Sequence, residues 1–203
     1  MKRIWRLLVA LFLVAVSSYG IAQEVEKRGK DVDKPAAEAE SSELTIARVL
    51  RASVTHANRM MFAMAMEMPE DKYGFAPTNG EFKNVRTFGQ QIKHVAAANF
   101  IYAAAILGEK PPVDVGENED GPEALKTKAE IIQYMKRSFA YVQKAVATIN
   151  DKNLVEPFKN PFGEGQATRL SMAMFIIGHC DDHYGQLDQY LRMNGLETPA
   201  GRR

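Results

Sequence analysis

A single cysteine, Cys180, occurs among the 203 residues of the sequence. One chain therefore forms no internal disulfide, and it cannot build a metal site from several thiolates. Glycine (14 residues) and proline (9 residues) are too scarce for a fibrous or low-complexity chain. The 26 basic residues nearly balance the 25 acidic ones, so the sequence lacks the positive surplus that is typical of proteins that bind nucleic acid.

The common catalytic motifs are absent as well. The sequence has no G-x-S-x-G nucleophile elbow, no phosphate-binding Walker loop and no H-E-x-x-H metalloprotease motif. Any catalytic chemistry must therefore come from residues that no such motif marks. The residues alone assign no catalytic acid, base or nucleophile.

The first 22 residues are typical of an export signal. Three basic residues open the segment, an apolar run covers 7–16, and Gly20 and Ala22 take the −3 and −1 positions of a cleavage site after Ala22. The apolar run is too short to span a bilayer comfortably. We therefore predict a periplasmic or secreted protein without a stable membrane span after cleavage, with an uncleaved anchor as the alternative.

The segment 23–42 is predicted to be a flexible linker. Half of its residues are charged and almost none has a large apolar side chain, so it cannot bury enough surface to order itself. The folded domain is predicted to cover residues 43–199, and a loose tail follows at 200–203.

Four long helices are predicted, and no window shows the alternation of apolar and polar residues that is typical of strands. Thr87 and Thr127 each open a capping box, and Gly108 and Gly195 follow the second and the fourth helix as C-terminal glycines. Long helices with such connections favour an all-α protein, a four-helix bundle. The predicted helices cover residues 43–68, 87–108, 127–150 and 166–194.

Two of the four histidines, His179 and His183, are four residues apart in the last predicted helix. This spacing places both imidazoles on one helix face, where they suit a single metal ion. His94 lies within the second predicted helix among small and apolar residues, and an up-and-down bundle can bring it to the pair. Three neutral imidazoles with an open position form a catalytic zinc site, and they also suit nickel or ferrous iron.

Three residues near these histidines are candidates for supporting roles. Asp182 follows His179 by three positions, and we consider the hypothesis that its carboxylate orients an imidazole. Tyr102 and Tyr190 are candidates to line the cavity with their hydroxyls. Phe175 is predicted to continue the inward face of the histidine pair, whereas Cys180 is interpreted as a small buried hydrophobic residue.

The remaining metal-binding side chains are explained more simply. His56 has neighbours of mixed character and is predicted to be a surface or structural histidine. Met61, Met64 and Met68 share one face of the first predicted helix, and thioethers can bind Cu(I) in an exported protein. The same face is needed for the core, so packing is the favoured interpretation.

Two segments of the chain resemble the DinB-like superfamily. One is residues 75–96, which end in Val-Arg-Thr-Phe-Gly-Gln-Gln-Ile-Lys-His-Val-Ala, and the other is residues 179–195, which begin with His-x-x-x-His-Tyr-Gly-Gln-Leu. The resemblance extends over about 43–199. It implies an up-down-down-up four-helix bundle in which three histidines hold a metal ion. On this chain those histidines are His94, His179 and His183.

The resemblance also implies classes of function. Superfamily members of this kind include metal-dependent thiol transferases, maleylpyruvate-isomerase-like enzymes and proposed hydrolases, and homodimers are frequent among them. The first hypothesis is therefore a metal-dependent hydrolase or transferase, with one divalent ion, zinc before nickel or iron, and an unknown small-molecule substrate. The alternative is a non-catalytic exported binding or structural protein, in which the metal ties the second and fourth helices together.

Overall fold

The computed structural model describes residues 44–78, 80 and 84–199. The predicted signal peptide, linker and tail lie outside these residues. Within the described part, four long helices account for most of the chain, as the all-α prediction requires, and none of them is long and apolar enough to cross a membrane. They are α2 (Ile46–Glu67), α3 (Phe88–Leu107), α4 (Lys128–Val146) and α5 (Arg169–Met193).

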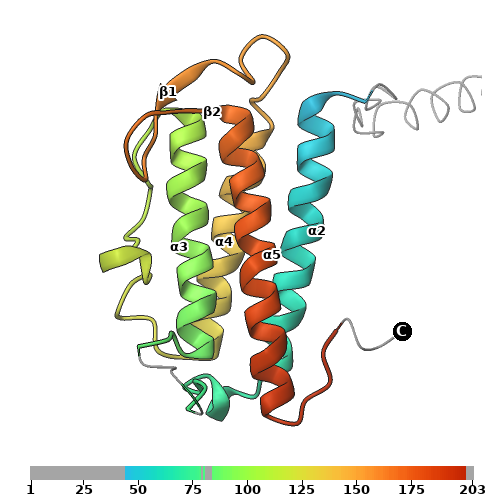
Figure 1. The fold of residues 1–203 in the computed structure, drawn as a ribbon, viewed down its shortest axis with the longest axis vertical. Helices are drawn as coiled ribbons and strands as arrows, with labels where there is room; N and C mark the ends of the chain where they lie inside the picture. The colour runs from blue at the N-terminus through green and yellow to red at the C-terminus, as the bar shows by residue number, and fades with distance from the viewer. Residues whose placement is uncertain (1–43, 79, 81–83, 200–203) are drawn as a thin grey trace, which may run out of the picture. The chain divides into compact units, whose positions relative to one another are not determined.

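The four helices form one bundle with two long connections. In Figure 1, α2 and α5 run in one direction, and α3 and α4 run in the other. Both α4 and α5 pack against α3 and against α2. The loop from α2 to α3 holds a single 3₁₀ turn, η1 (Glu70–Lys72), and the crossover from α3 to α4 holds another, η2 (Glu117–Glu119). This is the up-down-down-up arrangement that the resemblance implied.

A small sheet precedes α5 and corrects the prediction. Two strands of three residues each, β1 (Pro157–Lys159) and β2 (Gln166–Thr168), pair antiparallel. The prediction that the last helix begins at 166 is therefore wrong, and strands this short are too brief to show alternation. Ala167 is buried in the extended segment, and α5 begins only after Thr168, whose side chain accepts a hydrogen bond from the Ser171 backbone.

The end of α4 also differs from the prediction. The helix ends at Val146 and not near Asn150. The Thr148 hydroxyl donates a hydrogen bond to the Ala145 carbonyl at 2.7 Å, and the Asn150 side chain donates one to the Thr148 carbonyl at 3.3 Å. Such bonds from short polar side chains to the backbone compete with the helical pattern and favour a turn.

Helix α3 is buried on nearly all sides, because α4, α5 and the crossover segment surround it. Its run Val95–Ala98 is fully buried, and small side chains there allow neighbouring helices to approach closely. Three methionines are also fully buried in the hydrophobic core: Met61 and Met64 in α2, and Met68 directly after it. This is the packing role that was favoured for them.

The helix cap at the start of α4 lies away from the histidines and gives an independent test of the fold. The Thr127 side chain accepts from the Glu130 backbone at 3.3 Å, and the Glu130 carboxylate accepts from the Thr127 backbone at 2.9 Å. We expect Thr127→Ala to lower the free energy of unfolding by about 1 kcal/mol. Thr127→Ser keeps the hydroxyl and should lose much less. Urea denaturation of both variants measures the difference, and equal losses would contradict the cap.

Candidate metal centre

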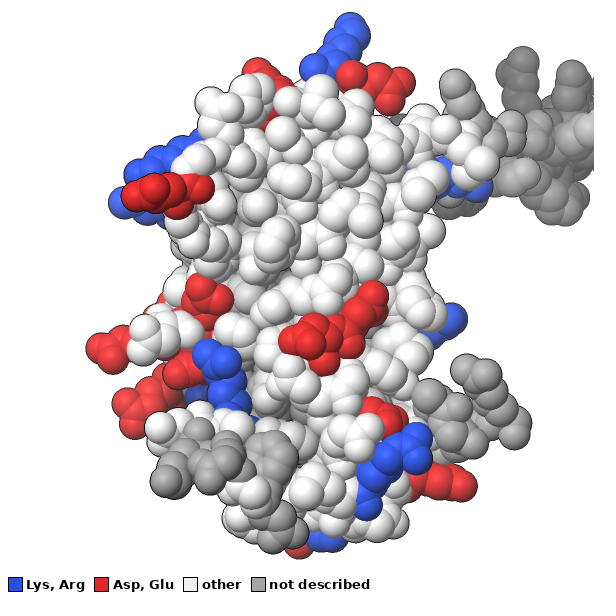
Figure 2. Space-filling model, in the orientation of Figure 1, with Lys and Arg blue, Asp and Glu red and all other residues white. Residues whose placement is uncertain are grey.

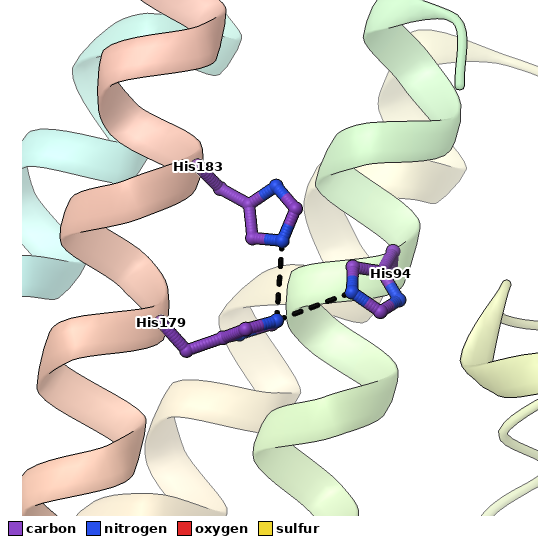
Figure 3. Close-up of side chains that lie close together, drawn as sticks. All are labelled: His94, His179 and His183. Carbon is purple, nitrogen blue, oxygen red and sulfur yellow. Dashed lines mark hydrogen bonds between the residues drawn. The ribbon is translucent and has the colours of Figure 1, made fainter. Parts of the chain in front are cut away.

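The three predicted histidines meet between α3 and α5 (Figure 3). His94 lies in the second turn of α3, and His179 and His183 occupy successive turns of α5. The Nε2 atom of His179 lies 3.1 Å from the Nε2 atom of His94 and 3.1 Å from that of His183. Among the described residues, these three form the one group of potential metal ligands close enough to share an ion.

The separation of the nitrogens fits a metal site. Two imidazole nitrogens bound to one zinc ion at about 2.0–2.1 Å lie about 2.8–3.4 Å apart, for bond angles between a right angle and a tetrahedral angle. Hydrogen bonding explains the cluster less well. The Nδ1 atom of His94 lies 3.0 Å from the Glu119 carbonyl, so it carries the ring proton and leaves Nε2 without one. His179 Nε2 can carry only one proton, so a hydrogen bond from it explains only one of its two 3.1 Å contacts.

Burial keeps the imidazoles uncharged. It lowers the pKa of His179 to about 3, with His183 and His94 adding to the effect, and it lowers the pKa of His183 to about 4. The pKa of His94 is lowered for the same reason, and the positive charge of Arg86 acts in the same direction on all three rings. At neutral pH the three rings are therefore in the neutral form that binds metal ions.

A strained loop fixes the orientation of His94. Glu119, whose carbonyl oxygen accepts from His94, and its neighbour Asn118 both have left-handed backbones, with φ of 63° and 51°. Gly116, at φ 71°, packs so tightly that an added Cβ would lie 2.2 Å from the Gly121 carbonyl oxygen. Side chains are rarely tolerated in this conformation. The loop therefore depends on Gly116 to hold the Glu119 carbonyl in place.

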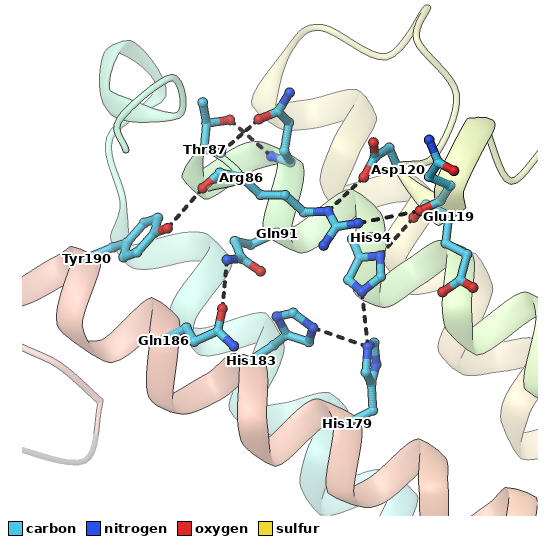
Figure 4. A network of polar contacts seen from close by, with 12 residues as sticks. Arg86, Thr87, Gln91, His94, Glu119, Asp120, His179, His183, Gln186 and Tyr190 are labelled. Carbon is cyan, nitrogen blue, oxygen red and sulfur yellow. Dashed lines mark hydrogen bonds and ion pairs between the residues drawn. The ribbon is translucent and has the colours of Figure 1, made fainter. Parts of the chain in front are cut away.

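Arg86 ties the same loop to the start of α3. Its Nε donates to the Asp120 carboxylate at 2.7 Å, and its Nη2 donates to the Asn118 carbonyl at 3.4 Å. Figure 4 shows the guanidinium between the helix start and the loop, next to His94. Arg86 thus supports His94 through the loop, while its charge favours uncharged imidazoles. Both effects act on the candidate ligands without direct contact.

The two histidines of α5 are oriented differently. The Nδ1 atoms of His179 and His183 are buried and make no hydrogen bond with the described residues. Their Nε2 atoms are the ones that converge with His94. Helix spacing, and not a hydrogen bond to Nδ1, therefore aims these two rings. A shared ion would bind all three through Nε2.

The three supporting candidates lie near the cluster in different ways. The ring of Tyr102 stands edge-on to that of His179, with centroids 6.0 Å apart, and burial raises the pKa of Tyr102 to about 12. The Tyr190 hydroxyl donates to the Arg86 carbonyl at 2.9 Å. Asp182 is exposed, and its carboxylate accepts a hydrogen bond from Gln186 at 2.9 Å and not from an imidazole.

One prediction about the inward face of α5 is wrong. Phe175, one turn before His179, is 60% exposed. Its ring lies at the surface, with its centroid 5.9 Å from that of the Tyr102 ring. Cys180 is free and buried, as predicted, and its thiol has a pKa raised to about 12 by burial. His56 is exposed, in keeping with a surface histidine.

A cleft of about 880 Å³ lies between the start of α3 and the second half of α5, and its lining includes residues one helical turn from His94 and His183 but none of the three histidines. Arg86 and two glutamines line it: Gln91 precedes His94 by three residues, and Gln186 follows His183 by three. Both glutamines lie one helical turn from a histidine in the sequence, yet the sequence analysis gave no role to either of them. It also missed Arg86 and the Glu119 carbonyl, because their contacts depend on an irregular loop.

The fold and the histidine cluster together define a four-helix bundle with a three-histidine site. A sequence profile of the DinB superfamily matches residues 54–187, and the chain belongs to this superfamily. No curated protein matches the chain.

Two solved structures share the fold. A conserved protein from Enterococcus faecalis is 13% identical, with a TM-score of 0.59, over 74% of this chain and 97% of its own. A DinB-like protein from Bacillus cereus is 20% identical, with a TM-score of 0.58, over 74% of this chain and 93% of its own. At this identity the likeness shows the fold alone.

Gly116 offers a test of how His94 is held. Gly116→Ala forces the loop to move, so the Glu119 carbonyl should leave His94 Nδ1. Losing such a partner typically weakens metal binding by about 10- to 100-fold, and we expect a loss of this size when Co²⁺ is titrated into the variant. Gly163→Ala is the control, since an added Cβ there meets nothing within 4 Å. Unchanged affinity in Gly116→Ala would contradict the role of the loop.

Proposed function

We propose that the protein holds one divalent metal ion on His94, His179 and His183, and that it is a metal-dependent hydrolase or transferase acting on a small molecule. Zinc is the first choice, and nickel or iron suits the same ligands. The observation that carries the proposal is the convergence of three uncharged imidazole nitrogens one helical turn from residues that line an open cleft. A metal site that only stabilises the bundle would not need a cleft for a small molecule.

The chemistry would come from the ion together with the cleft. A divalent ion with three protein ligands keeps a position for water or substrate, and it can acidify water or polarise a carbonyl or thiol. The chain supplies the surroundings: Arg86 fixes the loop behind His94, and Gln91 and Gln186 present amides at the cleft. No residue of the chain is assigned as the general base.

The alternative is a non-catalytic role. The same three histidines join α3 to α5, so a bound ion would tie two helices together and stabilise the bundle. In this case the position that the three protein ligands leave free would not be accessible to small molecules. The two proposals therefore differ in whether a coordination position is open.

Export and self-association complete the proposal. The sequence features of residues 1–22 support export to the periplasm or beyond. A homodimer is supported by the exposed apolar side chains Met174 and Phe175 in the first two turns of α5. Figure 2 shows few charged side chains over the upper part of the face on which α3 and α5 lie.

Metal content tests the site directly. Protein purified without a histidine tag should contain about one equivalent of a divalent metal, measured by elemental analysis. The double variant His179→Ala/His183→Ala removes two of three ligands and should contain almost none. His56→Ala removes an exposed histidine and should keep the full amount. Absence of metal in the wild type after reconstitution, or its retention in the double variant, would contradict the proposal.

Cobalt spectroscopy separates the catalytic from the structural role. With Co²⁺ in the site, an open position should let azide bind and shift the visible absorption bands at millimolar concentration. We expect this shift in the wild type. A spectrum that azide leaves unchanged, together with a large loss of thermal stability when the metal is removed, would favour the structural alternative.

A further inference from the structure

Three polar side chains, joined by two hydrogen bonds, extend from the surface of α5 to the buried residue Gln91, which lines the cleft. The Asp182 carboxylate accepts a hydrogen bond from Gln186 Nε2 at 2.9 Å, and Gln186 Oε1 accepts one from Gln91 Nε2 at 2.8 Å. Asp182 is exposed, Gln186 is half-buried and Gln91 is only 4% exposed. We call these three residues the amide relay.

Chemistry fixes the direction of the amide relay. An ionised carboxylate only accepts hydrogen bonds, so Gln186 must turn its NH₂ group toward Asp182. The carbonyl of Gln186 then faces Gln91, and Gln91 must turn its own NH₂ group toward it. The orientation of both amides therefore follows from Asp182 and from the order of the three side chains.

One acceptor is left over at the inner end. Gln91 Oε1 is buried and has no hydrogen-bond partner among the described residues. Figure 4 shows this oxygen on the side of the amide that faces the histidines, and the nitrogen turned to Gln186. A buried acceptor without a partner is costly, so such an atom, in a residue that lines the cleft and on the side toward the histidines, points to a ligand that brings a donor.

The rest of the cleft lining indicates the charge of that ligand. Five of its residues carry side-chain amides: Asn84, Gln90, Gln91, Gln186 and Gln189. Among the described residues of the lining, one is basic and one is acidic, Arg86 and Asp120, and they are paired with each other at 2.7 Å. This described part of the lining therefore has no net charge and is rich in groups that recognise other amides and hydroxyls.

We infer that Gln91 Oε1 is a specificity-determining acceptor, and that the cleft takes a small polar molecule with an N–H or O–H group beside its metal-binding oxygen, as in a carboxamide. This inference rests on the proposed metal at the three histidines. Gln91 receives the donor, and Asp182 and Gln186 act as positioning residues that keep the Gln91 amide from turning over.

Two matched probes test the inference on metal-loaded protein. Acetohydroxamic acid binds metal ions through its carbonyl oxygen and its N–O oxygen, and the nitrogen between the carbonyl carbon and the N–O oxygen carries a hydrogen, whereas N-methylacetohydroxamic acid lacks that N–H. Dissociation constants are measured by titrating each probe into Co²⁺-loaded protein and following the visible bands. Wild type should bind the N–H probe about tenfold more tightly, as one hydrogen bond to a buried acceptor allows.

Variants distinguish the hydrogen bond from simple size. Gln91→Leu keeps the bulk but removes the acceptor, so the two probes should bind equally. Asp182→Ala removes the acceptor that fixes the two glutamine amides, so these amides can turn over and the preference for the N–H probe should fall. Asp181→Ala is the control, because it removes a neighbouring exposed carboxylate outside the amide relay and should leave the preference unchanged. A preference that persists in Gln91→Leu, or equal binding in the wild type, would overturn the inference.

Metal content is determined on every sample, so that the two proposals fail in different ways. A wild type that binds no Co²⁺ overturns the metal centre and the inference with it. A wild type that binds one equivalent of Co²⁺ without distinguishing the probes overturns the inference and leaves the metal centre standing. If Gln91→Leu loses metal, the comparison of Asp182→Ala with Asp181→Ala decides.

Discussion

The packing of three uncharged imidazoles between α3 and α5 is the constraint on which the rest of the site depends. Burial lowers the pKa of each ring, and the nearby Arg86 charge acts in the same direction. Buried polar rings that face one another are costly unless something satisfies their nitrogens. The spacing of 3.1 Å between neighbouring Nε2 atoms suits one shared ion better than it suits a hydrogen-bond network.

The surroundings of the cluster divide into two parts with different tasks. On one side, the loop with Gly116 and Glu119 holds the orientation of His94, and Arg86 ties that loop to the start of α3. On another side, Gln91 and Gln186 face the cleft (Figure 4). The first part orients a candidate ligand, while the second lines a cleft of about 880 Å³. This division supports the proposal of an open coordination position.

Much of the fold follows from local signals in the sequence. The capping boxes at Thr87 and Thr127 mark the starts of α3 and α4 correctly, because they depend on residues only three positions apart. The pairing of His179 with His183 follows from helix geometry alone. Joining His94 to that pair required only an up-and-down bundle with α3 beside α5.

The remaining features depend on contacts that local patterns do not encode. The partner of His94 is a backbone carbonyl 25 positions away in an irregular loop, and a carbonyl leaves no mark in the sequence. Phe175 lies one turn before His179 in α5, yet its ring is 60% exposed, with the Tyr102 ring of α3 5.9 Å away. The strand at 166–168 exists only because β1 pairs with it.

X-ray absorption at the zinc edge tests the central claim most directly, because it counts the imidazoles around the ion and measures their distances. Zinc-loaded protein is predicted to show three imidazole nitrogens at about 2.0–2.1 Å and one further light atom from water or a small ligand. A spectrum with fewer than three imidazoles, or with a shell of oxygen atoms only, would contradict a metal centre built from His94, His179 and His183.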